Sequence, residues 1–314
     1  MSNDTLIRVE HLWRYYGSSC AVRDVSFEVR RGEVLGFLGP NGAGKSTIMQ
    51  IISGNLAPSA GRVWINGVDI LDQPRQAKAS LGFLPEQPPL YRELTVDEYL
   101  RYCARLHGIS RASQNAALST AKQRCGLSDV GQRLIGNLSK GYQQRVGIAQ
   151  AIIHAPAVVI LDEPTVGLDP IQIREIRALI CELRNEHSVI LSTHILPEVQ
   201  ATCDRVQIIN RGELVLADTT EGLLRHMQTL SLLIGLRRPP AFEILRAVAG
   251  VEAVEAADDN LIRLRYSVRL NPAEALVKLA VAQDWGLYEL SPERISLEQI
   301  FVDITRTEDE ASAA

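Results

Sequence analysis

The clearest chemistry in this 314-residue chain lies in G-P-N-G-A-G-K-S at residues 39–46. A glycine, four residues and then Gly-Lys-Ser is the spacing of a phosphate-binding P-loop. The glycines accept backbone angles that side chains disfavour, so successive N–H groups can face one anion. Lys45 adds a positive charge for the β- and γ-phosphates, and Ser46 offers a hydroxyl to Mg²⁺. The predicted nucleotide contacts are Gly39, Pro40, Asn41, Gly42, Ala43, Gly44, Lys45, Ser46 and Thr47.

The elements on either side of this loop fit a phosphate site. Residues 33–38 (E-V-L-G-F-L) predict a strand that enters the loop, and residues 47–53 (T-I-M-Q-I-I-S) predict a helix that leaves it. Such a helix points its N-terminus at the phosphates. A chance glycine-rich turn is the alternative, and the order of strand, loop, Lys-Ser and helix favours a nucleoside triphosphate site.

Two adjacent carboxylates follow a second apolar run, V-V-I-L-D-E at residues 158–163. A continuous apolar strand is typical of a parallel strand buried on both faces, and ligands bind at the carboxyl ends of such strands. Asp162 can therefore hold Mg²⁺ opposite Ser46, and Glu163 can polarise an attacking water. A solvated Asp-Glu pair is the alternative, and the P-loop favours the metal–nucleotide interpretation.

At residues 138–145 the sequence reads L-S-K-G-Y-Q-Q-R and resembles the ATP-binding cassette ATPases, whose signature is L-S-G-G-Q. Leu138, Ser139 and Gly141 match this signature, whereas Lys140 and Tyr142 depart from it. The resemblance implies that two cassettes enclose ATP between them, with Ser139 and Gly141 facing the nucleotide of the second subunit. Taken alone, Ser139 could be a simple helix cap.

Further matches extend the resemblance over about residues 5–220. It implies that Asp169, in V-G-L-D-P, reaches across the dimer and that His194, in S-T-H, contacts the γ-phosphate. With Glu163 as general base, Lys45 and His194 would stabilise the developing charge. Tyr16 resembles the aromatic residue that stacks on adenine; a buried core tyrosine is its alternative, and Tyr15 is the alternative register.

One departure concerns the glutamine that follows an early strand in this family. The expected position falls on Glu86, and glutamine comes one residue later, at Gln87. Either the loop is shifted by one residue, so that Gln87 contacts the nucleotide site, or Glu86 takes the role and adds negative charge near the phosphates.

The expected fold is α/β: a P-loop cassette with a mixed sheet core, an antiparallel β subdomain and a helical subdomain, followed by a small α+β appendage. The ATP-binding domain is predicted at residues 1–227, with a helical insert at about 86–140. Within it, Asn66-Gly67 predicts a hairpin turn and Thr95-Val96-Asp97-Glu98 predicts a capping box that opens a helix.

The order strand, helix, two strands, helix and strand, with the first helix at 241–249, predicts a ferredoxin-like domain at 228–305. A last helix is predicted from Ser296, and residues 306–314 predict a disordered tail.

Composition restricts the classes of function. The net charge is −4, which does not favour a nucleic-acid partner. The five cysteines form no C-x-x-C pair, and no signal peptide or membrane-spanning stretch is evident. A cytoplasmic protein is expected, bound peripherally to the inner face of the cell membrane through a partner.

The pattern most resembles the single-cassette ATPases of bacterial multidrug- and gliding-type exporters, which carry a similar C-terminal extension. That resemblance implies hydrolysis of Mg-ATP, a second ATPase subunit in a homodimer, and an integral membrane permease that receives the motion through the helical insert. A soluble cassette ATPase acting on a nucleic-acid or ribosomal partner is the alternative. The single cassette, the missing heptad insert and the negative charge argue against it.

Overall fold

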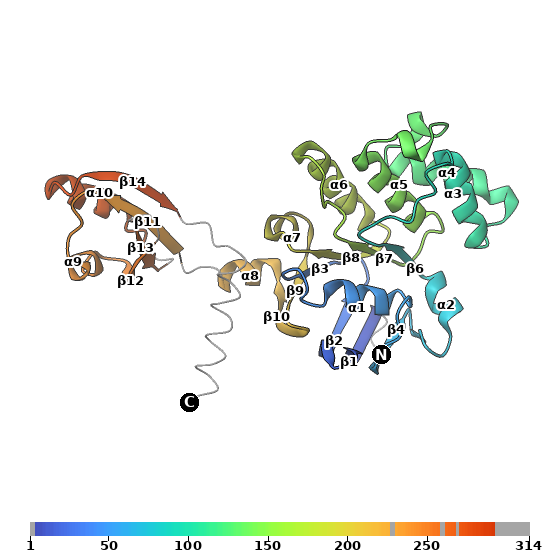
Figure 1. The fold of residues 1–314 in the computed structure, drawn as a ribbon, viewed down its shortest axis with the longest axis horizontal. Helices are drawn as coiled ribbons and strands as arrows, with labels where there is room; N and C mark the ends of the chain where they lie inside the picture. Colours follow the sequence, from blue (N-terminus) through green and yellow to red (C-terminus); the bar gives the residue numbers. More distant parts are fainter. Residues whose placement is uncertain (1–3, 227–229, 258–260, 268–269, 293–314) are drawn as a thin grey trace. The chain divides into compact units, whose positions relative to one another are not determined.

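The computed structural model describes residues 4–226, 230–257, 261–267 and 270–292. The chain divides into two compact units, Met1–Thr220 and Glu221–Ala314. Each unit has its own buried apolar cluster, so each is described by itself (Figure 1). None of the helices in the described residues combines the length and the apolar character needed to span a bilayer.

A six-stranded mixed sheet forms the centre of the first unit. Its order is β10-β9-β3-β8-β7-β6; β10 pairs with β9 antiparallel and the other pairs are parallel. Every residue of β3, β7 and β8 is buried, because both faces of the sheet are covered. The strands are β3 Val34–Leu38, β6 Leu81–Leu84, β7 Val158–Asp162, β8 Ser188–Thr193, β9 Arg205–Asn210 and β10 Glu213–Thr219.

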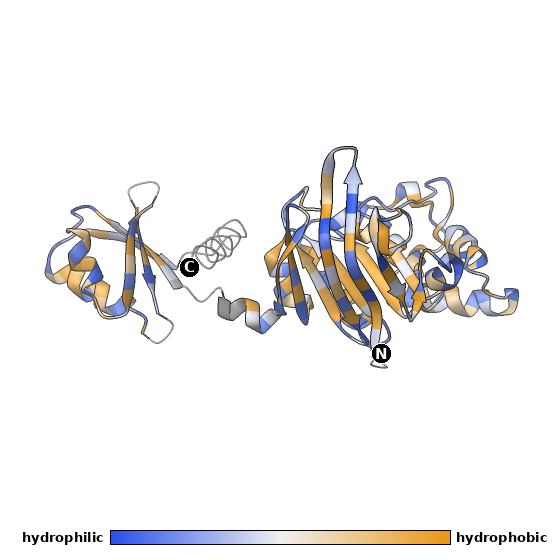
Figure 2. Cartoon of the chain, turned by 90° about the horizontal axis from the view of Figure 1, so that it is seen from below, coloured by the Kyte–Doolittle hydropathy of each residue, from blue (hydrophilic) through white to orange (hydrophobic). Residues whose placement is uncertain are grey.

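An antiparallel sheet of order β2-β1-β4-β5 packs beside it. Helix α1 (Lys45–Ile52) contacts β2 of this sheet and β7 and β8 of the other, and one apolar cluster contains residues of both sheets. The strands of the first unit carry much of the apolar colour in Figure 2. The strands of this antiparallel sheet are β1 Thr5–Tyr16, β2 Ser19–Arg30, β4 Ala60–Ile65 and β5 Val68–Asp69.

The helical insert begins with a predicted capping box. Thr95 Oγ1 accepts a hydrogen bond from Glu98 N at 3.2 Å, and Glu98 Oε2 accepts one from Thr95 N at 2.8 Å. Both bonds satisfy N–H groups that a helix start leaves unpaired. The remaining helices of this unit are α2 Pro74–Ala79, α3 Val96–Leu106, α4 Arg111–Arg124, α5 Lys140–Ile152, α6 Pro170–Leu183 and α7 Leu196–Thr202, with 3-10 turns at Ser128–Val130 and Ile135–Asn137. Helix α8 (Thr220–His226) follows.

The second unit contains one antiparallel sheet of order β12-β13-β11-β14. Its elements come in the predicted order, although the predicted helix at 241–249 is shorter. The predicted helix from Ser296 and the tail lie outside the described residues. The elements are β11 Leu230–Leu236, α9 Phe242–Arg246, β12 Val251–Ala256, β13 Leu261–Tyr266, α10 Ala273–Ala282 and β14 Leu287–Pro292.

Candidate nucleotide-binding and hydrolysis site

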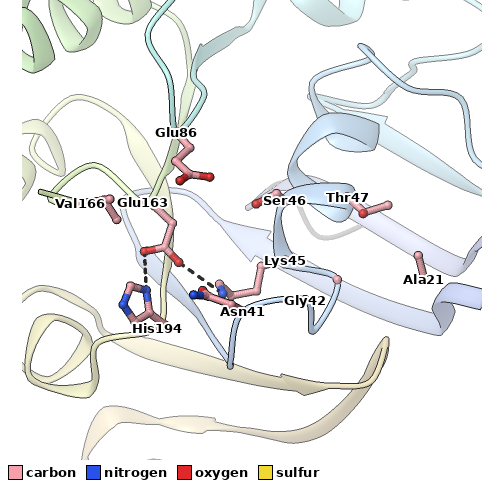
Figure 3. A pocket seen from close by; sticks show the side chains of 11 residues that line it. Ala21, Asn41, Gly42, Lys45, Ser46, Thr47, Glu86, Glu163, Val166 and His194 are labelled. Carbon is pink, nitrogen blue, oxygen red and sulfur yellow. Dashed lines mark hydrogen bonds and ion pairs between the residues drawn. The ribbon is translucent and has the colours of Figure 1, made fainter.

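A cavity of about 330 Å³ opens at the carboxyl ends of the parallel strands, next to the P-loop (Figure 3). This is the edge at which open α/β sheets bind their ligands. β3 leads into the P-loop, β7 into Glu163 and β8 into His194, so three neighbouring strands deliver the predicted residues. The lining residues are Ala21, Asn41, Gly42, Gly44, Lys45, Ser46, Thr47, Glu86, Glu163, Val166 and His194.

The P-loop backbone has the shape that its glycines allow. Gly44 has φ +106°, and a Cβ there would lie 2.6 Å from the carbonyl oxygen of Ala21. A side chain at this position would therefore collide with β2 as well as strain the backbone. Gly44 is also the N-cap of α1, and no side chain accepts a capping hydrogen bond from the first N–H groups of this helix. The first N–H groups of α1 are thus directed toward the place where an anion can bind.

Lys45 is held in place by the loop and by one carboxylate. Its Nζ donates hydrogen bonds to the carbonyl oxygens of Gly39 at 2.8 Å and Pro40 at 3.2 Å. The same Nζ lies 3.3 Å from Glu163 Oε1, and both side chains are almost fully buried, at 5% and 7% exposed. Glu163 therefore balances the charge of Lys45.

Glu163 also meets His194. Its Oε2 lies 2.9 Å from His194 Nδ1, and the imidazole is 40% exposed at the cavity (Figure 3). Glu163 has φ +48°, an uncommon conformation for a residue with a side chain, and its N–H donates to Ser192 O at 2.9 Å. Such backbone strain clusters at functional sites, where the surrounding structure holds it. Here the strained residue carries the carboxylate that bridges Lys45 and His194.

Asp162 lies deeper than these residues, at 3% exposed. Burial raises the pKa of Asp162 and the nearby Glu86 carboxylate adds to this, whereas the hydroxyls of Ser192 and Ser46 and the charge of Lys45 oppose it. Its Oδ1 has no hydrogen-bond partner among the described residues. A buried carboxylate oxygen without a donor, beside the P-loop serine, fits a hard cation such as Mg²⁺.

The comparisons with known proteins agree with this geometry. A family model described as ABC transporter matches residues 22–166. The ABC transporter ATP-binding protein NatA of Bacillus subtilis is 42% identical over 205 residues, which cover 65% of this chain and 83% of NatA. The chain belongs to the ABC transporter ATP-binding proteins. It is therefore the ATP-hydrolysing subunit of an ABC transporter, and residues 22–166 lie in its ATP-binding cassette.

One further relative matches over nearly its whole length, and one solved structure shares the fold of the cassette. The bacitracin transport ATP-binding protein BcrA of Bacillus licheniformis is 32% identical, and the alignment covers 96% of this chain and 97% of BcrA. A solved cassette, described as a dimer in a post-hydrolysis state with ADP and phosphate, is 23% identical, with a TM-score of 0.62 over 68% of this chain and 99% of that one. At that identity it shows the fold alone.

The two candidates for the family's loop glutamine differ in which cavity they line. Glu86 lines the P-loop cavity, opposite Ser46 in Figure 3. Gln87 lines a neighbouring cavity of about 510 Å³, which Glu86 also lines, together with Lys140 and Gln144 of helix α5. Glu86 is therefore the residue of this pair that the structure places beside the phosphate site.

Ser139 and Gly141 of the signature and Asp169 of the V-G-L-D-P segment are not among the residues that line the cassette's own phosphate cavity, whereas Val166 of that segment is. Ser139 caps α5, and its Oγ accepts from Tyr142 N at 3.4 Å. A Cβ at Gly141 would lie 2.6 Å from the side chain of Gln172, so glycine lets α5 and α6 approach. Asp169 caps α6 and accepts hydrogen bonds from Ile171 N at 2.9 Å and Gln172 N at 3.0 Å. Within one chain, Ser139 and Asp169 are helix caps, and Gly141 lies in the first turn of α5.

Tyr16 stands at the end of β1 and is 47% exposed, which does not match a buried core tyrosine. The guanidinium carbon of Arg14 lies 4.8 Å from its ring centroid. Tyr15 is 44% exposed and stacks on Trp13 with ring centroids 6.0 Å apart. Neither tyrosine is among the residues that line the phosphate cavity.

Sequence reasoning missed two residues that line the cavity, Ala21 and Val166. Ala21 comes from β2, and its carbonyl oxygen limits the space at Gly44. Neither side chain carries a reactive group, so no local pattern could have identified them. Their place follows from the packing of β2 and of the loop after β7 against the P-loop.

Proposed function

We propose that Glu163 is the general base of ATP hydrolysis, and that Lys45 and His194 stabilise the charge that develops on the γ-phosphate. The observation that carries this assignment is the position of the Glu163 carboxylate, 3.3 Å from Lys45 Nζ and 2.9 Å from His194 Nδ1 at the P-loop cavity. A carboxylate in that place can accept a proton from a water aligned with the γ-phosphate. His194 is 40% exposed and lines the same cavity, so its ring can face a bound nucleotide.

The metal site fits Ser46 and Asp162. The Ser46 hydroxyl lines the cavity, and the buried Asp162 Oδ1 lacks a donor. The described residues contain no group of three or more His, Cys, Asp or Glu side chains that could hold a metal. The proposed site offers two protein ligands. Mg²⁺ is usually held by one or two protein ligands, with phosphates and water completing its shell. When bound, the ion would neutralise phosphate charge.

The nucleotide itself would lie along the loop at residues 39–47, with its phosphates on the N–H groups of the loop and of α1. We assign the adenine contact to Tyr16, whose exposed ring is available for stacking. Glu86 is the better candidate for the loop-glutamine role, because it shares the phosphate cavity, and Gln87 is the alternative.

A second copy of the chain would complete each site. Ser139, Gly141 and Asp169 lie outside the cavity of their own chain, so the ATP that they contact would belong to the partner. A solved cassette with this fold is a dimer. The test is gel filtration of Glu163→Gln, which should run as a dimer with saturating Mg-ATP and as a monomer without it. A monomer under both conditions would contradict the sandwich arrangement.

The transporter that this cassette drives is proposed to be an exporter. BcrA, which matches over nearly the full length, is named for bacitracin transport. We place the permease contact on the helical insert, where Tyr91 and Tyr102 are 45% and 40% exposed and the Tyr91 ring packs against the rings of both Tyr99 and Tyr102. The chain would act in the cytoplasm, held at the membrane by the permease.

Replacing both exposed tyrosines tests this contact. The variant Tyr91→Ala with Tyr102→Ala should lose co-purification with the membrane protein that accompanies the wild-type chain, while its ATP affinity stays unchanged. Equal recovery of that membrane protein would place the contact elsewhere.

The second unit is proposed to be ferredoxin-like. Its elements follow the order strand, helix, strand, strand, helix and strand, and its first and third strands, β11 and β13, lie at the centre of an antiparallel sheet. The sequence motif alone could not specify that strand order.

A further inference from the structure

A buried carboxylate that belongs to none of the nucleotide motifs supports the Glu163–His194 pair. Glu198, on α7, is 1% exposed. Its Oε2 accepts a hydrogen bond from Thr193 Oγ1 at 2.7 Å, and its Oε1 accepts one from Thr165 Oγ1. Arg177 of α6 places Nη2 3.7 Å from the same Oε1. One side chain thus joins the segment after β7, the end of β8 and helix α6.

Both hydroxyl donors stand next to the proposed catalytic groups. Thr165 comes two residues after Glu163, and Thr193 directly precedes His194. Thr193 Oγ1 also accepts a hydrogen bond from Ile195 N at 3.1 Å. Its O–H donates to Glu198 while a lone pair takes the Ile195 N–H. One hydroxyl, on the residue before His194, therefore bonds the backbone N–H of the residue after it. Glu198 orients that hydroxyl by accepting its hydrogen bond.

The burial of these groups makes the arrangement sensitive to loss of the carboxylate. Thr165 and Thr193 are 2% and 0% exposed, so water cannot readily replace Glu198 as their acceptor. Removing the carboxylate leaves two buried hydroxyls without their acceptor and Arg177 without the negative charge 3.7 Å away. The two segments would then shift to satisfy their polar groups, and the 2.9 Å contact between Glu163 and His194 spans those segments.

We propose that Glu198 is a positioning residue for ATP hydrolysis, which sets the distance between Glu163 and His194 by holding both of their segments on one carboxylate. This inference rests on the roles proposed for that pair. Through Arg177 the same carboxylate reaches α6, whose first turn is capped by Asp169. Glu198 therefore also connects the pair to the segment proposed to face the ATP of a second copy.

Steady-state ATPase kinetics and ATP affinity, measured on Glu198→Gln and Glu198→Ala, test this role. Because a misplacement of about 1 Å can cost about a hundredfold in rate, we expect kcat to fall about tenfold in Glu198→Gln and further in Glu198→Ala. The affinity for Mg-ATP should change far less, since Glu198 lies outside the phosphate cavity. Glu182→Gln, an exposed glutamate on α6, is the matched control and should keep the wild-type kcat.

A double-mutant cycle separates positioning from general destabilisation. In a His194→Ala background, Glu198→Ala should lower kcat little further, because the Glu163–His194 contact that Glu198 positions is already lost. Losses that multiply would overturn the inference, as would a wild-type kcat in both Glu198 variants. Should His194→Ala itself keep the wild-type kcat, the role proposed for His194 fails and this inference fails with it. If His194→Ala lowers kcat and both Glu198 variants keep the wild-type kcat, the inference about Glu198 fails and the role proposed for His194 stands.

Two milder variants cover the case in which Glu198→Ala does not fold. Thr193→Val and Thr165→Val each remove one of the two hydroxyl donors at nearly constant shape. Each should lower kcat by less than Glu198→Gln does, with ATP affinity retained. If both keep the wild-type kcat, Glu198 does not position the pair through these hydroxyls and the proposal is wrong.

Discussion

Glu163→Gln should increase the affinity of the cassette for ATP while it lowers the rate of turnover. In the nucleotide-free chain, Glu163 balances the buried charge of Lys45. When ATP binds, Lys45 must pair with the phosphates in place of Glu163. Part of the attraction between Lys45 and ATP therefore only replaces an existing ion pair. A glutamine keeps the shape of the side chain and removes both the competing partner and its repulsion of the phosphates.

The size of the effect follows from the contact distance. Two unit charges 3.3 Å apart interact by about 1 kcal/mol in bulk water and by about 5 kcal/mol at an effective dielectric constant of about 20. Desolvation of the buried ions offsets part of this energy. We expect a net gain of about 1–2 kcal/mol for ATP binding, which is a factor of about 5–30 in Kd. The loss of the general base should lower kcat by about 10²–10⁴.

The assay is calorimetric or fluorescence titration with one slowly hydrolysed ATP analogue and Mg²⁺, on wild type, Glu163→Gln and Glu86→Gln. Glu86 lines the same cavity, while Glu163 makes the ion pair with Lys45, so Glu86→Gln reports the effect of removing one negative charge alone. Glu163→Gln should bind more tightly than Glu86→Gln. Equal affinity of these two variants, or weaker binding by Glu163→Gln than by wild type, would refute the proposed exchange of partners by Lys45.

Three further predictions concern separate parts of the chain. Tyr16→Ala should weaken binding of ATP by about 1–3 kcal/mol, the range for a lost base stack. Binding of inorganic triphosphate should stay unchanged. Equal losses for both ligands in parallel titrations would exclude adenine stacking. Thr95→Ala removes the cap of α3 and should lower the free energy of unfolding by about 1 kcal/mol in urea, whereas an unchanged midpoint would mean that the cap contributes nothing. Burial and the neighbouring His107 lower the pKa of His154 to about 4 from 6.5, so the unfolded chain takes up a proton that the folded chain resists, and stability is lost as pH falls from 6.5 toward 4. We expect this to cost about 2 kcal/mol between pH 7.5 and pH 4.5, and urea curves of His154→Asn should lack that loss; the same pH dependence in both proteins would contradict it.

Features that depend on adjacent residues were predictable from the sequence. The P-loop, the capping box at Thr95 and the turn at Asn66-Gly67 each depend on a few neighbouring residues, and each forms as expected. The turn is clear because Asn66 and Gly67 have φ of +49° and +79°, which these residue types tolerate. The continuous apolar runs also identified the buried parallel strands.

Contacts between distant segments were not predictable in the same way. Nothing local to Ala21 indicates that its carbonyl lies against Gly44, and Glu198 resembles any other helical glutamate in the sequence. Their roles depend on which strands become neighbours and on how closely the segments pack. Helix α9, which packs against β12, is also shorter than predicted, because local propensity sets helix ends only loosely.

Strand β8 determines whether the reacting groups can meet at all. It lies between β3 and β7, with Thr193 paired to Leu38 on one side and Ser192 paired to Asp162 on the other. The P-loop, His194 and Glu163 follow these three strands, so their separations are set by the two registers. Slipping either register by one residue moves a strand end by about 3.3 Å and turns its side chains to the other face. The 2.9 Å contact between Glu163 and His194 could not survive that change. The buried residues of β8 therefore position the site as directly as the polar residues that follow them.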